Sequence, residues 1–275
     1  MAAADTPGGT AAHNAADAIL VADGVLRRFG GLTAVDVDHL AVERGTITAL
    51  IGPNGAGKTT LFNVLTGFDR AQAGTWSLDG RPIAGLSAHR IARLGMVRTF
   101  QLTKALARLT VADNMKLGAV GQRGESFLGA LVPALWRAQE GEVEARADAL
   151  LEHFGLARMR HELGGTLSGG QRKLLEMARA LMVEPRLIML DEPTAGVNPA
   201  LTQSLLVYIK ELRANGVTVL FVEHDMDVVT EISDRVVCLA EGRVIADGTP
   251  AEIGTNPAVI DAYLGTRHGA RAGEA

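Results

Sequence analysis

Residues 52–60 have the sequence GPNGAGKTT, which suits a loop that binds phosphate. Small residues let a backbone curl so that successive N–H groups point inward at phosphate oxygens. Lys58 could then reach the outer phosphates of a nucleotide, and the hydroxyl of Thr59 could ligate Mg²⁺. A chance glycine-rich turn is the alternative, but an apolar run at residues 47–51 and a helical pattern after the loop favour phosphate binding. The candidate nucleotide-binding residues of this loop are Gly52, Pro53, Asn54, Gly55, Ala56, Gly57, Lys58, Thr59 and Thr60.

Two adjacent carboxylates, Asp191 and Glu192, end a second apolar run. Asp191 could hold Mg²⁺ through water, and Glu192 could act as the general base that polarises an attacking water. Acidic residues at the end of a strand are usually only solvated, so this pattern alone is a weak signal. Because it follows a phosphate-binding loop in the same chain, it becomes a strong one.

A third segment, residues 167–171 with the sequence LSGGQ, is typical of a helix start. Ser168 can cap the helix, and Gln171 three residues later completes a capping box. A cap does not require the adjacent glycines Gly169 and Gly170, which destabilise a first turn unless another group must approach the backbone closely. We therefore expect a second anion site here, and two such sites in one chain suggest a composite site shared by two subunits. The helix that follows has one apolar face, formed by Leu174, Leu175, Ala178, Leu181 and Met182.

Strand and helix patterns alternate along the chain, which predicts an α/β fold with a mainly parallel sheet covered by helices. Three short apolar runs are typical of buried strands: residues 47–51, 187–190 and 217–222. Each run is followed at once by polar or glycine-rich residues. Ligands gather at such carboxyl-end loops in open α/β sheets, so we expect the site there.

The middle of the chain, residues 87–161, has a helical pattern, most clearly in the amphipathic stretch at residues 142–156. We expect this part to be a helical subdomain inserted into a sheet domain that spans residues 18–255.

The end of the chain returns to strands. Glu241-Gly242-Arg243 predicts a hairpin turn between strands at residues 236–240 and 244–247, a small antiparallel part of the fold. Residues 256–275 are expected to form a C-terminal extension that is helical around residues 257–264.

The composition bounds the class of protein. The length of 275 residues allows one large α/β domain with an insertion, and the net charge of −4 leaves no electrostatic footprint for nucleic acid. The single cysteine, Cys238, excludes a disulfide framework and fits a reducing cytosol. No apolar stretch reaches the roughly 18 residues that span a bilayer, so any work at a membrane would go through partners. Residues 1–17, rich in Ala and Gly, are expected to be a disordered tail rather than a signal peptide.

The phosphate loop, the LSGGQ segment and the strand that ends in Asp191-Glu192 occur in the same order as in ABC ATPases. The chain resembles that family along nearly its whole length, and LSGGQ is specific because few other nucleotide-binding families carry it. The resemblance implies ATP, Mg²⁺ and a head-to-tail dimer that holds two ATP molecules. Each ATP would lie between the loop of Lys58 in one subunit and Ser168, Gly169, Gly170 and Gln171 of the facing subunit.

Three further residues match positions of that family. Phe29 matches the aromatic residue that stacks on adenine, with a core aromatic at a strand end as the alternative. Gln101 matches the glutamine that touches Mg²⁺ and links the sheet domain to the helical insert. His224 matches the histidine that contacts the γ-phosphate and steadies Glu192, with a structural histidine as the alternative. A metal site at residues 223–225 is disfavoured because adjacent residues of an extended segment point to opposite faces.

One position departs from the family pattern. Many members have aspartate where this chain has Asn198, so its role in a dimer contact is left open. Asn198 before Pro199 is also typical of a helix N-cap with proline at the first helical position.

Five further segments are RRFGG at 27–31, LTGF at 65–68, VRTFQ at 97–101, EHDM at 223–226 and NPAVIDAYL at 256–264. With them the chain resembles, more finely, the larger ATPase subunit of bacterial branched-chain amino acid importers. This resemblance implies two transmembrane permease subunits, a second ATPase subunit that is homologous or identical, and indirectly an extracytoplasmic solute-binding protein. The chain would then lie at the cytoplasmic face of the membrane. Importers for urea or short amides share most of these features, and a lipopolysaccharide-export ATPase has a similar ending, so both remain open.

Apolar residues after Gln101 recur at helical spacing and are a candidate dock for a permease helix, the alternative being the subdomain's own core. They are Leu102, Ala105, Leu106 and Leu109.

Two other classes of protein fit the sequence less well than a transporter subunit does. A soluble ABC-type protein that acts on DNA or ribosomes usually has long coiled coils or tandem ATPase domains, and this chain has neither pattern. A regulatory switch that binds ATP without turnover would not need both Glu192 and His224. The sequence therefore favours ATP hydrolysis coupled to transport.

Overall fold

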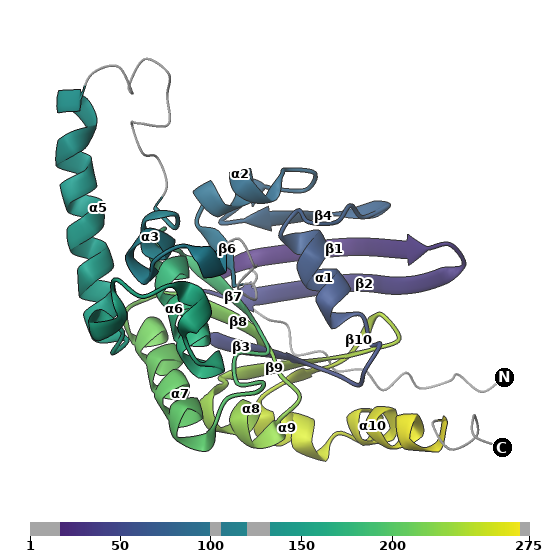
Figure 1. Ribbon diagram of the computed structural model, residues 1–275. Coiled ribbons are helices and arrows are strands. Elements are labelled where there is room, and N and C mark those ends of the chain that lie inside the picture. The colour runs from purple at the N-terminus through teal and green to yellow at the C-terminus, as the bar shows by residue number, and fades with distance from the viewer. Residues whose placement is uncertain (1–16, 100–105, 120–132, 270–275) are drawn as a thin grey trace, which may run out of the picture.

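The computed structural model describes residues 17–99, 106–119 and 133–269, and it contains two sheets (Figure 1). In the larger sheet the strand order is β10-β9-β3-β8-β7-β6; the pairs from β9 to β6 are parallel, and β10 is antiparallel to β9. This confirms an α/β fold with a mainly parallel sheet. The strands are β3 (Ile47–Ile51), β6 (Met96–Arg98), β7 (Leu187–Asp191), β8 (Thr218–Val222), β9 (Arg235–Ala240) and β10 (Arg243–Gly248).

The smaller sheet is antiparallel, with the order β2-β1-β4-β5. Its strands are β1 (Ala18–Phe29), β2 (Leu32–Glu43), β4 (Ala73–Leu78) and β5 (Arg81–Pro82). Helix α1 (Lys58–Leu65) buries Leu61, Phe62, Val64 and Leu65 in a core that also contains residues of both sheets. The helix that starts in the phosphate loop therefore packs against residues of both sheets.

The parallel strands are buried on both faces, which explains why they are short apolar runs without alternation. In β3, Ile47, Ala49 and Ile51 belong to one hydrophobic core, and Leu50 belongs to the core shared with α1. The helices α6 (Gly169–Leu181), α7 (Pro199–Ala214) and α8 (Met226–Ile232) contribute buried residues to the first core.

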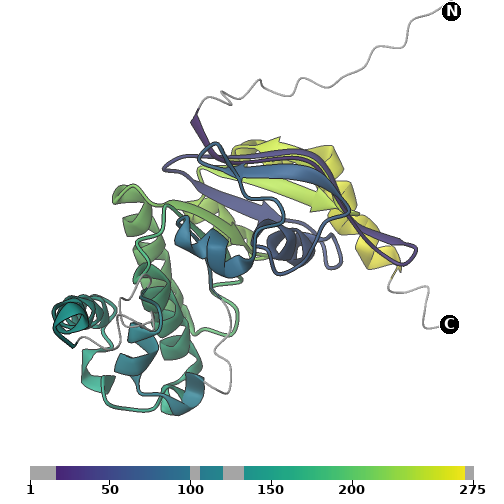
Figure 2. The same cartoon turned by 90° about the horizontal axis from the view of Figure 1, so that it is seen from above.

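A helical part stands beside the sheets, as the teal helices of Figure 2 show. It contains α3 (Val111–Lys116) and α5 (Pro133–His153), and both pack against α6. The 3₁₀ turn η2 (Leu106–Arg108) precedes α3, and η4 (Ala157–Met159) and η5 (Gly164–Thr166) lie between α5 and α6.

The stretch at residues 87–161, expected to be helical, starts with α2 (Ala88–Arg93) but then contributes strand β6 to the sheet. Gly95 ends α2 with φ of +95°, and its carbonyl accepts the N–H groups of Arg186 and Leu187 at 2.8 and 3.1 Å. A left-handed glycine thus turns the chain onto the sheet edge, which the helical pattern around it conceals.

The C-terminal part matches the expected hairpin and helix. Glu241 and Gly242, with φ of 49° and 81°, form the turn, and Arg243 is already the first residue of β10. Helices α9 (Pro250–Thr255) and α10 (Pro257–Gly269) follow. Among the helices of the described residues, none is long and apolar enough to cross a membrane.

The core predicts the chemistry of Cys238, which is fully buried in β9. Burial raises the pKa of its thiol to about 11, against an ordinary value of about 8.5. The thiol is therefore neutral at pH 8, and we expect iodoacetamide to label the native protein at least about a hundredfold more slowly than the urea-unfolded protein. Mass spectrometry of timed samples measures this; equal rates in both states would contradict the described core. Because burial disfavours the thiolate, Cys238 leaves stability unchanged below about pH 8.5, and the fold loses stability as the pH rises from there toward 11.

Candidate active site

The register of the parallel strands brings the sequence-predicted residues to one sheet edge. Val222 of β8 pairs with Leu50 of β3 on one side and with Asp191 of β7 on the other. The phosphate loop, Glu192 and Glu223 directly follow these positions. A cleft of about 290 Å³ opens there, lined by Thr59, Thr99, Lys173, Glu176, Met177, Leu190, Asp191, Glu192, Pro193, Ala195 and Leu205.

Two glycines of the phosphate loop cannot be replaced without a clash. A Cβ at Gly52, where φ is +145°, would lie 2.1 Å from the carbonyl oxygen of Leu239, and one at Gly57, where φ is +99°, would lie 2.2 Å from that of Ala34. Gly57 caps α1, and the first turn of this helix contains no acidic residue. The loop therefore offers the positive end of a helix and a closely packed backbone, as phosphate binding requires.

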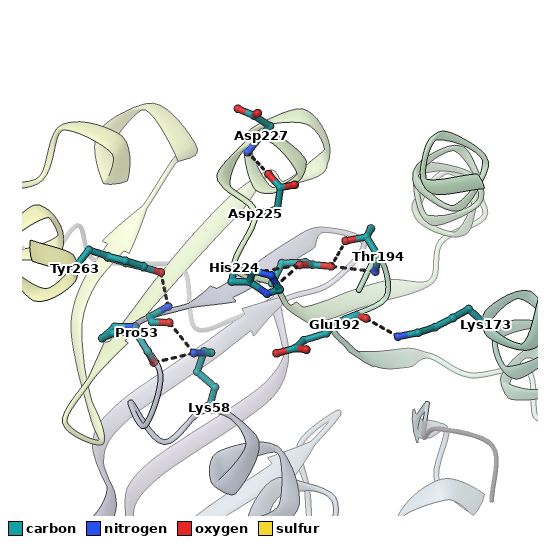
Figure 3. A network of polar contacts seen from close by, with 11 residues as sticks. Pro53, Lys58, Lys173, Glu192, Thr194, His224, Asp225, Asp227 and Tyr263 are labelled. Atoms are coloured by element: carbon teal, nitrogen blue, oxygen red, sulfur yellow. Dashed lines mark hydrogen bonds and ion pairs between the residues drawn. The ribbon is translucent and has the colours of Figure 1, made fainter. Parts of the chain in front are cut away.

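Lys58 folds back onto its own loop. Its Nζ donates to the carbonyl oxygens of Gly52 and Pro53 at 2.6 and 3.0 Å (Figure 3). Partial burial lowers its pKa, while the charges of Glu192 and Asp191 oppose that shift. The ammonium group thus lies within electrostatic reach of both carboxylates, and phosphate oxygens could take the place of the carbonyls as its partners.

Asp191 has a basic partner that the sequence did not reveal. Nη2 of Arg98, at the end of β6, donates to its carboxylate at 2.6 Å, and Nη1 donates to Oδ1 of Asn63 in α1 at 2.6 Å. The guanidinium is almost buried, with 5% of the Arg98 side chain exposed. Since Asp191 and Thr59 line the same cleft, a carboxylate and a hydroxyl oxygen are available together, a donor set that fits Mg²⁺.

Glu192 has a left-handed backbone, with φ of 46°, which is costly for a residue with a side chain. Neighbouring elements hold it there: its N–H donates to Val222 O at 3.0 Å, and its carbonyl accepts Nζ of Lys173 from α6 at 2.6 Å. The exposed side chain turns toward Lys58 in Figure 3. An exposed carboxylate whose backbone is held in this way can polarise a water molecule.

Glu223 is fully buried and joins two loops of the site. Its Oε1 accepts the N–H and the hydroxyl of Thr194 at 3.0 and 2.5 Å, and its Oε2 accepts the N–H of His224 at 3.2 Å (Figure 3). The loop after Glu192 and the loop of His224 are therefore tied to one carboxylate.

Two residues that the sequence predicts to contact the nucleotide, His224 and Phe29, are exposed. The side chain of His224 is 63% exposed, and Phe29 is 47% exposed at the end of β1, with the guanidinium of Arg27 over its ring at 4.1 Å. Phe29 is therefore not a core aromatic residue. Asp225 Oδ1 accepts the N–H of Asp227 at the start of α8. The carboxylates of Glu223 and Asp225 therefore have different hydrogen-bond partners.

The LSGGQ segment starts α6 with the predicted capping box: Ser168 accepts the N–H of Gln171, and Gln171 Oε1 accepts the N–H of Ser168. A Cβ at Gly170 would lie 1.9 Å from Leu201 of α7, so packing within this chain accounts for that glycine. Gly169 is exposed, and a Cβ added there would meet only Nη2 of Arg172, at 4.0 Å. Asn198 caps α7 as predicted by accepting the N–H of Leu201 at 3.0 Å.

The structure brings together only part of the predicted site. The loop at residues 52–60 and Asp191, Glu192 and His224 gather at the sheet edge, whereas residues 168–171 do not line the cleft of their own subunit. Gln101 lies outside the described residues. The sequence analysis missed Arg98, Lys173 and the structural role of Glu223, because the partners of these residues are distant in the sequence. The one local signal was that Glu223 is a charged residue directly after the apolar run of β8.

Comparison with known proteins identifies the family and the fold. Residues 35–195 match the family described as "ABC transporter", and residues 243–269 match "Branched-chain amino acid ATP-binding cassette transporter". The chain belongs to the ABC transporter family. It is an ATP-hydrolysing subunit of that family, as the sequence predicted.

The ABC relatives cover this chain nearly from end to end. It is 45% identical over 250 residues to the high-affinity branched-chain amino acid transport ATP-binding protein BraF of Pseudomonas aeruginosa, covering 90% of this chain and 98% of the relative. The corresponding LivG protein of Escherichia coli K12 is 42% identical over 249 residues, with coverages of 90% and 98%.

Two solved structures have the same fold. A nucleotide-free ATP-binding cassette of an ABC transporter superposes with a TM-score of 0.79 at 36% identity, covering 90% of this chain and 98% of its own. An ADP conformation of such a cassette gives a TM-score of 0.78 at 35% identity, with coverages of 90% and 99%.

The Glu223 network predicts a variant that slows turnover. In Glu223→Gln an amide NH₂ replaces one oxygen, so either Thr194 or His224 loses its acceptor. We expect unfolding to become easier by about 1–3 kcal/mol and kcat to fall about tenfold, with KM for ATP changed less than about twofold. Steady-state ATPase kinetics and urea unfolding measure this. The matched control is Glu231→Gln, since exposed Glu231 pairs with Lys210 at 3.0 Å. Equal rates for the two variants would contradict a positioning role for Glu223.

Proposed function

We propose that this chain is the ATP-hydrolysing subunit of an importer for branched-chain amino acids. The observation that carries the proposal is the shared sheet edge, where the phosphate loop, Asp191, Glu192 and His224 gather. The names of the relatives and the match of residues 243–269 support the substrate class. We infer an ATPase domain at residues 18–255, with an insert at about 87–161 that supplies β6 as well as helices, and a C-terminal extension at residues 256–275.

ATP would bind through the phosphate loop. Backbone N–H groups of residues 52–60 would hold the phosphates, with Lys58 on the outer ones, and the exposed ring of Phe29 would stack on adenine. Thr59 and Asp191, with Gln101, would hold Mg²⁺, which when bound supplies charge neutralisation at the phosphates.

Hydrolysis would rely on the carboxylate of Glu192. It accepts a proton from water as the water oxygen attacks the γ-phosphorus, and the bond from that phosphorus to the bridging oxygen breaks to leave ADP and phosphate. His224, with its backbone held by Glu223, would contact the γ-phosphate and steady Glu192. The left-handed backbone of Glu192, bonded to β8 and α6, supports a fixed direction of attack.

A second ATPase subunit would complete the site. Ser168 and Gly169 are exposed, and residues 168–171 lie outside the cleft that this chain lines, so they are available to the nucleotide of a facing subunit. Gly170, packed on Leu201, would act there through its backbone. ATP held between two subunits would close the dimer, and loss of the γ-phosphate would release it.

Permease subunits would dock on a groove beside the helical part. It measures about 350 Å³ and is lined by Ala92, Val97, Arg98, Thr99, Leu106, Leu117, Gly118, Glu176, Arg179, Ala180 and Val183. Leu106 was proposed as a docking residue from the sequence, and Leu117 is 60% exposed. Of the other proposed docking residues, Leu109 is partly buried, and Leu102 and Ala105 lie outside the described residues. Docking to permeases would keep the chain at the cytoplasmic face of the membrane, and the solute-binding protein would act on it only indirectly.

Replacing the general base tests the chemistry. Glu192→Gln should retain ATP binding while kcat falls by about a hundred- to ten-thousandfold, because an amide cannot accept the proton of water. The matched control is Glu184→Gln, at an exposed glutamate whose backbone is also left-handed, with φ of 54°. Phosphate-release assays and ATP titration measure both properties. Hydrolysis by Glu192→Gln at the wild-type rate would remove Glu192 from this role.

Placing a charge in the groove tests the docking proposal. Leu106→Glu should cut recovery of the assembled transporter at least about tenfold, since an unpaired charge would be buried against the permease. ATP hydrolysis by the isolated chain should stay unchanged. Val207→Glu is the control, at an apolar side chain of α7 that is 50% exposed and does not line the groove. Normal assembly and uptake with Leu106→Glu would show that the permease docks elsewhere.

A further inference from the structure

A hydrogen bond joins the C-terminal helix to the phosphate loop. The N–H of Gly52, the first residue after β3, donates to the hydroxyl oxygen of Tyr263 in α10 at 2.9 Å. Figure 3 shows the Tyr263 side chain pointing at the backbone next to Pro53. The two residues are 211 positions apart, so the fold alone creates this contact.

Gly52 needs an acceptor from outside the sheet. The residue is buried, and its φ of +145° turns the chain away from the strand. Its α-carbon lies so close to Leu239 O that a Cβ would clash at 2.1 Å. A buried N–H without an acceptor costs free energy, so the Tyr263 hydroxyl stabilises this turn of the chain.

The same residue also anchors Lys58, the lysine proposed to bind phosphate. The carbonyl of Gly52 accepts Nζ of Lys58 at 2.6 Å, while its N–H is held by Tyr263. Both polar groups of Gly52 are thus engaged, one from the loop itself and one from α10. A shift of Gly52 would therefore move a partner of Lys58 as well.

Helix α10 is held in place independently of the loop. Asn256 Oδ1 accepts the N–H of Ala258 at 2.9 Å, and Val259 is buried in the core that covers the larger sheet. The preceding helix α9 is fixed by a capping box at Thr249 and by buried Ile253. Tyr263 packs against the same core, so its hydroxyl is presented from a rigid base.

The loop and α10 also face each other across a hollow of about 460 Å³. Its walls contain loop residues on one side and α10 residues on the other; the lining is Pro53, Asn54, Gly55, Ala56, Ala240, Glu241, Arg243, Ile245, Asp261 and Ala262. Tyr263 follows Ala262 directly and bonds to the residue before Pro53. The hydrogen bond thus connects the two walls where the loop leaves β3.

We propose that Tyr263 is a positioning residue for nucleotide binding, through which the C-terminal helix holds the root of the phosphate loop in its binding conformation. The inference rests on the proposed phosphate-binding role of residues 52–60. Tyr263 acts through Gly52 rather than by touching the nucleotide. Losing its hydroxyl leaves the chemistry intact but makes the loop less preorganised, which weakens binding.

The chain supplies a matched test, since it has two tyrosines. Tyr263→Phe removes the acceptor of Gly52, and Tyr208→Phe removes a hydroxyl that donates to the carbonyl of His153 at 3.1 Å. Isothermal titration of the full chain with ADP, and steady-state kinetics with ATP, compare wild type, both variants and Lys58→Ala. We expect Tyr263→Phe to weaken ADP binding about fivefold and to raise KM for ATP similarly, with kcat retained. Tyr208→Phe should bind ADP as wild type does.

The outcomes separate this inference from the proposed function. ADP binding by Tyr263→Phe equal to wild type, with Lys58→Ala binding much weaker, would overturn the role of Tyr263 alone. Equal weakening in both tyrosine variants would also overturn it, because a general loss of stability would explain the result. Unchanged ADP binding by Lys58→Ala would overturn the phosphate-loop proposal and the inference that rests on it.

Discussion

The parallel register of β3, β8 and β7 is the constraint on which the rest of this molecule depends. It makes three buried strands end side by side, so that the phosphate loop, Asp191, Glu192 and His224 meet at one sheet edge. Strands buried on both faces cannot slip without exposing apolar side chains, which fixes this meeting point. The layers of helices and the small antiparallel sheet serve to cover these strands and to hold α1 at the loop.

Polar and charged groups of the same chain form hydrogen bonds to the charged side chains at this edge. Lys58 is held by loop carbonyls, Asp191 by Arg98, and the buried carboxylate of Glu223 by Thr194 and His224. Buried charges are tolerated only when such partners are present. The Glu192 carboxylate differs, because its backbone is held while its side chain is exposed. The group proposed for chemistry is thus the one left accessible to water.

Local patterns predicted the elements well, and long-range pairs could not be predicted from them. The run at residues 47–51 became β3 without change, and the cap of α6 and the turn at Glu241-Gly242 formed as expected, because each depends on neighbouring residues. Strand β6 was missed, since three residues inside a helical pattern carry no periodicity of their own. The partners of Arg98 and Tyr263 depend on how distant segments meet, and no spacing in the sequence encodes that. At Gly170 the sequence suggested close approach by another group, whereas the structure explains the glycine by its packing against α7 of the same chain.

The chain combines a site for ATP hydrolysis, a groove beside it, and LSGGQ residues that do not line the cleft of their own subunit. The central claim is that this chain works as part of a membrane complex. Affinity purification of the subunit from its native membranes, with mass spectrometry of the co-purifying chains, tests that claim most directly. The account predicts two permease subunits and a second, related ATPase. Recovery of ribosomes, DNA or no membrane protein would contradict the transporter assignment and leave the ATPase site standing.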